Sequence, residues 1–249
     1  LWHELAGPRR VMTFSDTDAG ATVHVQSASW QGGAWDLHFT TPLGAERCTL
    51  RVAGRHNLRN AMAAAACAVA AGVPLAAIAR GLSAFEPVGG RSRALAVPLA
   101  DRTLTLIDDS YNANPDSVLA AIDVLAELPA PRLLALGDMG EVGEQGLAFH
   151  LEVLRHAQAR GIEAVHVAGS WMRQTCEALR AAGESVPTHW AEVDVLASHL
   201  AGVVAAAGAQ SPRSALVKGS RFMQMERVVQ ALQALGAPQQ EQKEVLHAA

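Results

Sequence analysis

The sequence predicts an α/β protein in which antiparallel strands and alanine-rich helices are followed by a mostly parallel sheet. Short apolar runs that alternate with polar residues fill the first fifty positions, as in strands with one buried face. Alanine is then dense over residues 57–85, and alanine is the best helix former. From residue 94 onward, apolar runs alternate with helical stretches, which is typical of βα units.

The first part of the chain is expected to form antiparallel hairpins. Its strand candidates are rich in Val, Thr, Trp and Phe, and Gly, Asp and Pro separate them, as turn residues do. No cluster of charged or histidine residues suggests chemistry in this part. The expected strands cover residues 11–15, 21–30, 34–41 and 47–54.

Two helices are expected after these strands. The first covers residues 57–72 and ends at Gly72, because glycine is common just past the end of a helix. The second covers residues 74–85 and has Pro74 in its first turn, where the missing N–H is tolerated. The stretch EPVGGRSR, residues 86–93, then has the composition of a linker.

A second domain is expected over residues 89–237, after a first domain of residues 1–88. Two strands within residues 94–107 flank a turn at Asp101–Arg102. Each later strand precedes a helix, as βα units require. These later pairs are residues 132–137 with 147–160, 164–169 with 171–182, and 214–219 with 222–235. The polar tail, residues 238–249, is expected to fray.

Composition and charge exclude several classes of protein. Of the 249 residues, 50% are hydrophobic and 18% are charged, so a substantial core is available and global disorder is not expected. A formal net charge of −4 with scattered basic residues argues against nucleic-acid binding and against a polybasic membrane surface. The three cysteines, Cys48, Cys67 and Cys176, form no CxxC pair and indicate buried thiols in a reducing compartment.

A cytoplasmic protein is expected. The longest apolar run, residues 61–71, is shorter than the roughly 20 residues that cross a bilayer, and no signal peptide opens the chain. The ten histidines show no HExxH pattern or similar spacing, so they predict no metal site. Because the sequence starts with Leu1 and soon enters a strand region, we expect it to be a fragment of a longer chain.

Four polar clusters each follow an apolar run of the second part. They are DDSYNANP (108–115), GDMGEVGEQG (137–146), GSW (169–171) and KGSR (218–221). The carboxyl ends of parallel strands meet at one edge of a sheet, and ligands bind there in open α/β folds. One polar turn is ordinary, but four on the same edge predict a ligand site.

The DDSYNANP cluster has both a functional and a structural interpretation. A carboxylate at a strand end, such as Asp109, is well placed to accept hydrogen bonds from ribose hydroxyls. Asn114 and Pro115 also fit a helix start, because Asn is a favoured N-cap and Pro a favoured first helical residue. Capping leaves four neighbours unexplained, namely Asp108, Asp109, Tyr111 and Asn112.

Two other motifs also allow alternatives. Lys218 and Arg221 lie beside an expected helix start, which favours anions, but a glycine turn with two solvated cations is the alternative. Asn57 and Asn60 are three residues apart and share a helix face, where two amides can read the edge of an adenine ring. An N-cap plus one surface amide is the simpler explanation of that pair. His150 falls in a first helical turn, where packing or surface roles are commoner than catalysis.

Together these motifs resemble the Mur ligase family. GRHNLRNAMAAAACA, GGR, DDSYNANPDSVLAAI, LGDMGEVGEQG, His150 and LVKGSRFMQME occur in the order and spacing of that family. YNANP and VKGSR…ME are similar to the members that use D-Ala-D-Ala, and the DNPR signature of the members that add the third peptide residue is absent. The resemblance covers nearly the whole chain from Gly54 onward and is more diffuse before it.

The resemblance implies that residues 1–88 are the end of a central ATPase domain and that residues 89–237 are a complete Rossmann-like domain. It implies ATP as cofactor, Mg²⁺ held mainly by ligands upstream of Leu1, and a monomer that takes UDP-MurNAc-tripeptide and D-Ala-D-Ala as substrates. The implied cofactor-binding residues are Asn57, Asn60, Arg91 and Asp109. The residues implied at the acceptor and the acyl phosphate are Tyr111, Asn112, Asn114 and Ser220, with Lys218 and Arg221 as catalytic residues.

By the same resemblance, ATP phosphorylates the terminal carboxylate of the tripeptide, and the amine of D-Ala-D-Ala attacks the acyl phosphate to form an amide. Magnesium and basic side chains offset the repulsion between the carboxylate and the phosphate. No G-x-x-x-x-G-K-[ST] phosphate loop occurs in the 249 residues, so the chain alone is expected not to ligate. A fragment of a folylpolyglutamate-type ligase and a non-catalytic module that binds a nucleotide or a dipeptide are the alternatives.

Overall fold

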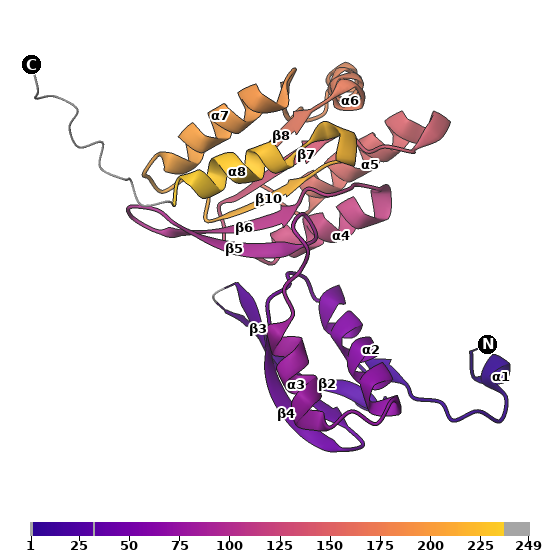
Figure 1. Cartoon of the computed structure of the whole chain (residues 1–249). Coiled ribbons are helices and arrows are strands. Elements are labelled where there is room, and N and C mark those ends of the chain that lie inside the picture. Colours follow the sequence, from indigo (N-terminus) through magenta and orange to yellow (C-terminus); the bar gives the residue numbers. More distant parts are fainter. Residues whose placement is uncertain (1, 32, 237–249) are drawn as a thin grey trace, which may run out of the picture.

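The computed structural model describes residues 2–31 and 33–236, and it forms two units, each with its own sheet (Figure 1). The expected fraying of residues 238–249 lies outside the described residues. The first sheet has four strands and the second has six, and helices accompany both, so the predicted α/β class is confirmed. No described helix is both long and apolar enough to cross a membrane.

The first unit is a sheet in the order β1-β2-β3-β4, against which α2 and α3 pack. β2, β3 and β4 are antiparallel neighbours, as the hairpin pattern predicted. A short helix, α1, precedes the sheet and was not predicted. The elements are α1 (Trp2–Ala6), β1 (Phe14–Ser15), β2 (Val23–Gln31), β3 (Ala34–Thr41), β4 (Gly44–Leu50), α2 (His56–Ala70) and α3 (Leu75–Ala84).

Two strand predictions in the first unit are wrong in part. β1 has only two residues and runs parallel to β2, instead of forming a hairpin with it. The side chains of Ser15 and Asp18 accept backbone N–H groups of the connecting loop, which brings the chain back to the start of the sheet. β4 ends at Leu50, because the chain leaves the sheet for α2 through Gly54, whose φ is +92°.

The core of the first unit lies between the sheet and its helices. Trp35, Leu37 and Phe39 alternate along β3 and are buried, as the period of two along a strand requires. α2 adds Leu58 and Met62 together with buried alanines. Small alanine side chains allow the helix backbone to pack closely, which explains why this part of the sequence is rich in alanine.

The second unit is a six-stranded sheet in the order β5-β6-β10-β7-β8-β9. β5 is antiparallel to β6, and all other neighbours are parallel, so the predicted mostly parallel, Rossmann-like sheet is confirmed. The elements are β5 (Arg93–Pro98), β6 (Thr103–Asp109), α4 (Pro115–Ala126), β7 (Arg132–Gly137), α5 (Gly146–Ala159), β8 (Ala164–Ala168), α6 (Ser170–Ala181), β9 (Thr188–Trp190), α7 (Val193–Ala205), β10 (Ser214–Lys218) and α8 (Glu226–Ala234).

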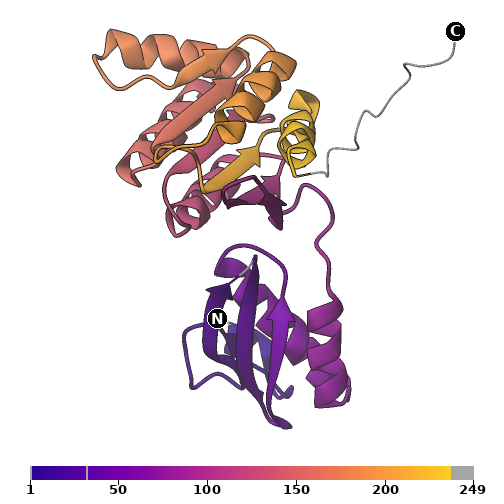
Figure 2. The same cartoon turned by 90° about the vertical axis from the view of Figure 1, so that its left-hand side faces the viewer.

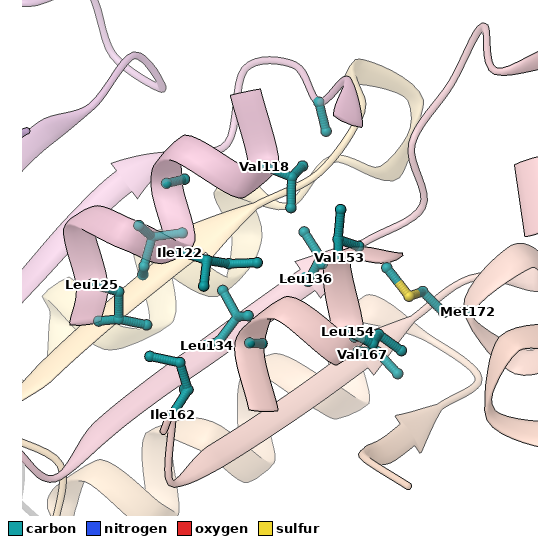
Figure 3. Close-up of a cluster of buried hydrophobic side chains, with 14 of the residues drawn as sticks. Val118, Ile122, Leu125, Leu134, Leu136, Val153, Leu154, Ile162, Val167 and Met172 are labelled. Carbon is teal, nitrogen blue, oxygen red and sulfur yellow. The ribbon is translucent and has the colours of Figure 1, made fainter. Parts of the chain in front are cut away.

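Helices cover both faces of the second sheet (Figure 1). α4, α5 and α6 pack on one face, where Leu134 and Leu136 of β7 meet Ile122 of α4 (Figure 3). α7 and α8 pack on the other face, which receives Leu133 and Ala135 of the same strand. Successive residues of β7 from Leu133 to Gly137 are therefore all buried, as expected for a strand inside a parallel sheet that is covered on both sides.

Three features of the second unit differ from the prediction. β9 and α7 were not predicted, since β9 has only three residues and α7 has no capping side chain to mark its start. The last helix begins at Glu226 instead of residue 222, because a 3₁₀ turn at Arg221–Met223 and the left-handed Gln224 interrupt it. Lys218 and Arg221 therefore lie beside a 3₁₀ turn and not beside an α-helix start.

The linker joins the two units (Figure 2), and the segment before α2 also contacts the second unit. The N–H of Ala53 donates to the carbonyl oxygen of Ser92 at 3.0 Å. A Cβ on Gly54 would lie 2.8 Å from a methyl carbon of Val124 in α4, so only glycine permits this approach of the backbone to the second unit. The beginning of α2 is thereby held against α4 and the linker.

Candidate functional site

The carboxyl ends of β6, β10, β7 and β8 lie side by side at one edge of the second sheet, which we call the rim. In the strand ladder, Asp109 of β6 is opposite Lys218 of β10, and Lys218 is opposite Leu136 of β7. Gly137 and Ala168 pair at the ends of β7 and β8. The prediction that four polar loops share one edge is therefore confirmed.

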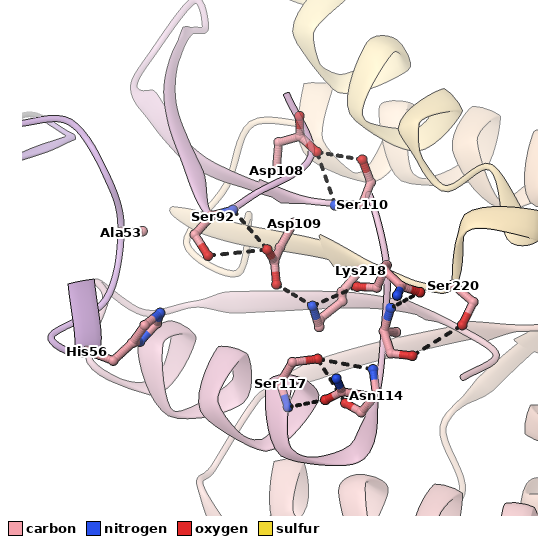
Figure 4. Close-up of polar contacts among 12 residues, drawn as sticks. Ala53, His56, Ser92, Asp108, Asp109, Ser110, Asn114, Ser117, Lys218 and Ser220 are labelled. Atoms are coloured by element: carbon pink, nitrogen blue, oxygen red, sulfur yellow. Dashed lines mark hydrogen bonds and ion pairs between the residues drawn. The ribbon is translucent and has the colours of Figure 1, made fainter. Parts of the chain in front are cut away.

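A buried ion pair joins Lys218 and Asp109 at the rim (Figure 4). Nζ of Lys218 lies 2.5 Å from Oδ2 of Asp109 and also donates to the carbonyl oxygen of Asn112 at 2.9 Å. Only 4% of the Lys218 side chain and 14% of the Asp109 side chain are exposed. Because an unpaired charge is costly at such burial, each of the two side chains stabilises the other.

The linker is attached to the rim through Asp108 and Asp109. Oδ1 of Asp109 accepts hydrogen bonds from the N–H of Ser92 at 2.8 Å and from its hydroxyl at 3.2 Å. Oδ2 of Asp108 accepts the N–H of Gly90 at 2.9 Å, and its Oδ1 accepts the N–H and hydroxyl of Ser110. The carboxylate that was predicted to bind a ribose thus already has donors on both oxygens (Figure 4).

Tyr111 follows β6 and lies close to two arginines. The guanidinium carbon of Arg91 is 4.3 Å from the centre of the Tyr111 ring, and that of Arg221 is 5.6 Å from it, which are cation–π distances. Arg221 also pairs with Glu226 at 3.2 Å. Tyr111 is 40% exposed, so a ligand at the rim can reach this basic surface.

Three other residues predicted for the site form hydrogen bonds within or between the rim loops. The buried hydroxyl of Ser220 accepts a backbone N–H of the loop after β7 and donates to the carbonyl oxygen of Ala113 at 3.3 Å. The side chain of Asn112 accepts the N–H of Ala113 at 2.9 Å. Asn114 caps α4, since its Oδ1 accepts the N–H of Ser117 at 2.8 Å. The capping interpretation of Asn114 is confirmed.

Asn57 and Asn60 lie in the first unit, at a cavity of about 540 Å³ between α2 and α3. Nδ2 of Asn57 donates to the carbonyl oxygen of Ala53 at 2.7 Å, and its Oδ1 accepts Nδ2 of Asn60 at 3.0 Å. The shared helix face is confirmed, whereas the N-cap alternative is wrong because Arg55 occupies the cap position. The rest of the lining is mostly apolar and includes Leu50, Val52, Ala61, Ile78 and Phe85.

A second cavity, of about 420 Å³, lies between the two units. Ala53 and His56 line it from the first unit, and Ser92 and Ile107 line it from the second. Burial lowers the pKa of His56, and the charge of Asp109 partly opposes that shift. The start of α2 thus faces the cavity between the units and lies within range of the Asp109 and Lys218 charges.

Asp138 is a buried rim residue for which no individual role was predicted from the sequence. Its carboxylate accepts the N–H of Trp171 at 3.0 Å and that of Met172 at 2.9 Å, in the first turn of α6. Gly169, with φ of +118°, makes room for this contact, since a Cβ there would lie 2.3 Å from the carboxylate. An acidic residue close behind an apolar run in the sequence could have pointed to Asp138, as it did to Asp109.

His150 is fully buried and supports the loop that follows β7. Its Nε2 accepts the N–H of Met139 at 2.9 Å, so the ring proton is on Nδ1, which donates to the carbonyl oxygen of Gly146 at 2.6 Å. The ring stacks on Trp171, with 6.0 Å between the ring centres. Burial lowers the pKa of His150, and it therefore serves as a neutral structural histidine.

The chain is expected to lose stability as the pH falls below about 6.5. Burial lowers the pKa of both His150 and His166 in the folded chain, whereas unfolded histidines bind a proton near pH 6.5. The unfolded state therefore binds more protons in this window, which favours unfolding. Urea midpoints at pH 7.5, 6.5 and 5.5 would check this, and the slope should be shallower in His150→Gln. A midpoint that stays constant or rises toward pH 5.5 would contradict the expectation.

Other reactive side chains in the described residues form no site. Cys48 and Cys176 are buried free thiols, as predicted, and burial raises the pKa of Cys48 to about 11. Cys67 is exposed on α2, so the prediction of a buried thiol is wrong there, because this position faces away from the sheet. Within residues 2–31 and 33–236, no group of three or more His, Cys, Asp or Glu side chains could hold a metal ion.

Known proteins resemble this chain in both sequence and structure. A UDP-N-acetylmuramoyl-tripeptide–D-alanyl-D-alanine ligase of Escherichia coli (strain K12) is 38% identical over 235 residues, which are 94% of this chain and 50% of the relative. The ligase of the same name from Haemophilus influenzae is 32% identical over 93% of this chain and 48% of its own length. A crystal structure of MurF from Acinetobacter baumannii superimposes with a TM-score of 0.74 and 28% identity, over 93% of this chain and 48% of that one.

The match to a protein family covers the rim. The chain spans about half the length of the curated relatives that it matches. A family described as Mur ligase, glutamate ligase domain, matches residues 92–221, which run from Ser92 of the linker to Arg221 after β10. The matched segment thus includes Asp109, Tyr111 and Lys218. The chain belongs to the Mur ligase family.

Proposed function

We propose that this chain forms part of an ATP-dependent ligase that joins D-Ala-D-Ala to UDP-MurNAc-tripeptide in the cytoplasm, a step of peptidoglycan precursor synthesis. In this proposal residues 1–88 belong to an ATPase domain and residues 89–237 form the carboxyl-terminal domain. Support comes from the Escherichia coli and Haemophilus influenzae ligases, whose names describe this reaction and which match 94% and 93% of the chain.

One observation carries the proposal, namely the gathering of cationic side chains around the rim. Lys218 and Arg221 of the KGSR segment and Arg91 of the linker all lie at or beside the carboxyl ends of β6 and β10. Amide formation from a carboxylate and a phosphate donor brings negative groups together, and fixed cations stabilise such charge. Lys218 uses two of its three N–H donors on Asp109 and Asn112, so one is available to a ligand.

The residues present fit an adenine nucleotide. ATP, when bound, supplies the phosphoryl group that activates the carboxylate of the tripeptide. We assign the adenine to the cavity beside Asn57 and Asn60, because its apolar wall suits a flat ring and Asn60 keeps Oδ1 and one N–H for the ring edge. We assign the ribose to Asp109, where its hydroxyls would share the carboxylate with Ser92 or replace it.

The acceptor dipeptide is assigned to the exposed surface of the rim around Tyr111. Asn112 and Asn114 bond within the chain through their side-chain oxygens, which leaves their NH₂ groups for peptide carbonyl oxygens. Ser220 shapes this surface by joining the loops after β7 and β6. Lys218 and Arg221 stabilise the negative charge that develops when the amine attacks.

Magnesium does not fit the described residues. No cluster of three or more potential ligands occurs among residues 2–31 and 33–236. Asp109, the carboxylate nearest to Lys218, is already bound on both oxygens. We therefore assign no step to a metal ion held by these residues. In this proposal, magnesium would enter only as an ion bound to ATP.

A chimera tests the proposed function. In it, this chain replaces the half of the Escherichia coli relative with which it aligns over 235 residues. We expect the chimera to form ADP and the amide product, identified by mass spectrometry, only when D-Ala-D-Ala is present. Lys218→Met in the chimera is expected to lower kcat by about 100-fold, the effect of removing a group that stabilises transition-state charge. The isolated chain is expected to give no product.

Glutamate serves as the second acceptor in this experiment. Turnover with glutamate and not with D-Ala-D-Ala would replace the proposal by a folylpolyglutamate-type ligase. A folded chimera that binds ATP or the dipeptide in calorimetry but turns over neither acceptor would favour the alternative of a non-catalytic binding module. Product formed by the isolated chain with D-Ala-D-Ala would support the reaction but contradict the assignment of part of the active site to residues outside this chain.

A further inference from the structure

Asp108 is a buried carboxylate of the rim that the proposed reaction does not use. It is the residue before Asp109 on β6, so its side chain points to the opposite face of the sheet. Only 7% of Asp108 is exposed. Its Oδ1 accepts the N–H and the hydroxyl of Ser110, and its Oδ2 accepts the N–H of Gly90 in the linker. This last contact ties the linker to the end of the strand.

Gly90 is held to the second unit by both of its backbone groups. Its N–H donates to Asp108 at 2.9 Å, and its carbonyl oxygen accepts the N–H of Tyr111 at 3.0 Å. The φ of Gly90 is +80°, and a Cβ there would lie 2.8 Å from the backbone nitrogen of Tyr111. We call these two hydrogen bonds, from Gly90 to Asp108 and from Tyr111 to Gly90, the clamp. The clamp requires glycine in the linker and a hydrogen-bond acceptor at residue 108 of the strand.

Arg91 lies between two fixed points of the linker. Gly90 on one side is bound to Asp108, and Ser92 on the other side is bound to Asp109. The Arg91 guanidinium lies 4.3 Å from the centre of the Tyr111 ring. No described carboxylate pairs with Arg91, since no ion pair joins it to any acid in residues 2–31 and 33–236. Its charge is thus available to an oxyanion.

We propose that Asp108 is a positioning residue that acts through Arg91: by holding Gly90, it keeps the Arg91 guanidinium over Tyr111, where it can meet a substrate oxyanion. The identity of that oxyanion, a phosphate or carboxylate group of the ligase substrates, rests on the proposed function. The positioning itself does not, because it concerns only contacts within this chain.

The chain contains a built-in probe of this arrangement. Tyr111 is the single tyrosine among the 249 residues, so 3-fluorotyrosine gives one fluorine NMR resonance at the end of the clamp. We expect Arg91→Gln to shift this resonance, since it removes the cation from the ring. Asp108→Asn should shift it as well, because an amide NH₂ cannot accept the N–H of Gly90. The double variant should match Arg91→Gln alone.

The double variant decides between positioning and a local structural effect. If Asp108 acts through Arg91, adding Asp108→Asn to Arg91→Gln changes nothing further; if it acts on Tyr111 directly, the two shifts add. Additive shifts, or no shift in Asp108→Asn, would overturn the proposal. Asp36→Asn, an exposed carboxylate of the first unit, is the charge control and should leave the resonance unmoved.

A glycine variant tests the clamp from the side of the linker, in case Asp108→Asn does not fold. Gly90→Ala should shift the fluorine resonance, because its Cβ would collide with Tyr111 and force the linker that carries Arg91 to move. Gly89→Ala, which has open space around its Cβ, is the control and should cause no shift. An unshifted resonance in folded Gly90→Ala would overturn the proposal.

In the active chimera, substitutions of Arg91 and Asp108 should lower kcat/KM without adding to each other. Arg91→Gln and Asp108→Asn are each expected to cost about tenfold, as the loss of one hydrogen bond to a charged group does, and the double variant no more than that. A chimera without activity would contradict the proposed function, whereas the fluorine shifts would still test the positioning role of Asp108. Additive fluorine shifts together with an active chimera would contradict only the positioning role of Asp108.

Discussion

Replacing Lys218 by methionine is expected to lower the free energy of unfolding by about 3 kcal/mol. The substitution keeps a long apolar stem but removes the ammonium that lies 2.5 Å from Asp109, whose side chain is only 14% exposed. The carboxylate then keeps only the Ser92 donors, and the carbonyl oxygen of Asn112 loses its N–H donor. Urea unfolding, read as a change of midpoint at constant slope, measures this loss.

The double variant Lys218→Met with Asp109→Asn is the control for this prediction. Removing both charges of a buried pair is much less costly than removing one, so the double variant should recover most of the lost stability. The amide of the new side chain can still accept the N–H of Ser92. A single variant as stable as the unaltered chain, or a double variant less stable than the single one, would show that the pair contributes no such stability.

Gly169→Ala is expected to destabilise the chain by about 3 kcal/mol, through backbone strain and the loss of a helix cap. The φ of +118° and ψ of 170° at this residue are accessible almost only to glycine. The new Cβ would also lie 2.3 Å from the buried carboxylate of Asp138, which would have to leave the first turn of α6. Thermal unfolding followed by circular dichroism measures the effect.

Gly161→Ala is a reference variant with a positive φ but no collision in that experiment. Gly161 follows α5 with a φ of +70°, and a Cβ there would have nothing within 4 Å. Alanine at this position should therefore cost only about 1 kcal/mol, the strain of a left-handed residue. Equal losses at Gly161 and Gly169 would mean that the contact with Asp138 has no influence on stability.

The layout of the rim could be predicted because each polar cluster directly follows an apolar run. The order of strand, loop and helix along the chain requires parallel strands, and parallel strands place their following loops at one edge. The start of α4 was equally readable, since Asn114 and Pro115 carry local cap chemistry that does not depend on the rest of the fold.

Contacts between distant segments could not be predicted in the same way. Asp109 and Lys218 are 109 residues apart and share a rung only because β10 inserts between β6 and β7, and no local pattern encodes that strand order. The attachment of Asp108 to Gly90 also depends on how the linker folds back onto the sheet. For His150 the position was clear, but its burial and its bond to Met139 depend on the packing of α5 against α6.

The place of β10 in the sheet has a consequence for synthesis on the ribosome. β10 is the last strand of the described chain and yet it lies in the middle of the sheet, between β6 and β7. At about 5–20 residues per second, roughly 5 to 20 s separate the emergence of Asp109 from that of Lys218. From the emergence of β7 until the end of this interval, β6 and β7 have open edges that face each other, and such edges promote aggregation. The nascent chain should therefore depend on chaperones until β10 has emerged, and the rim can be completed only then.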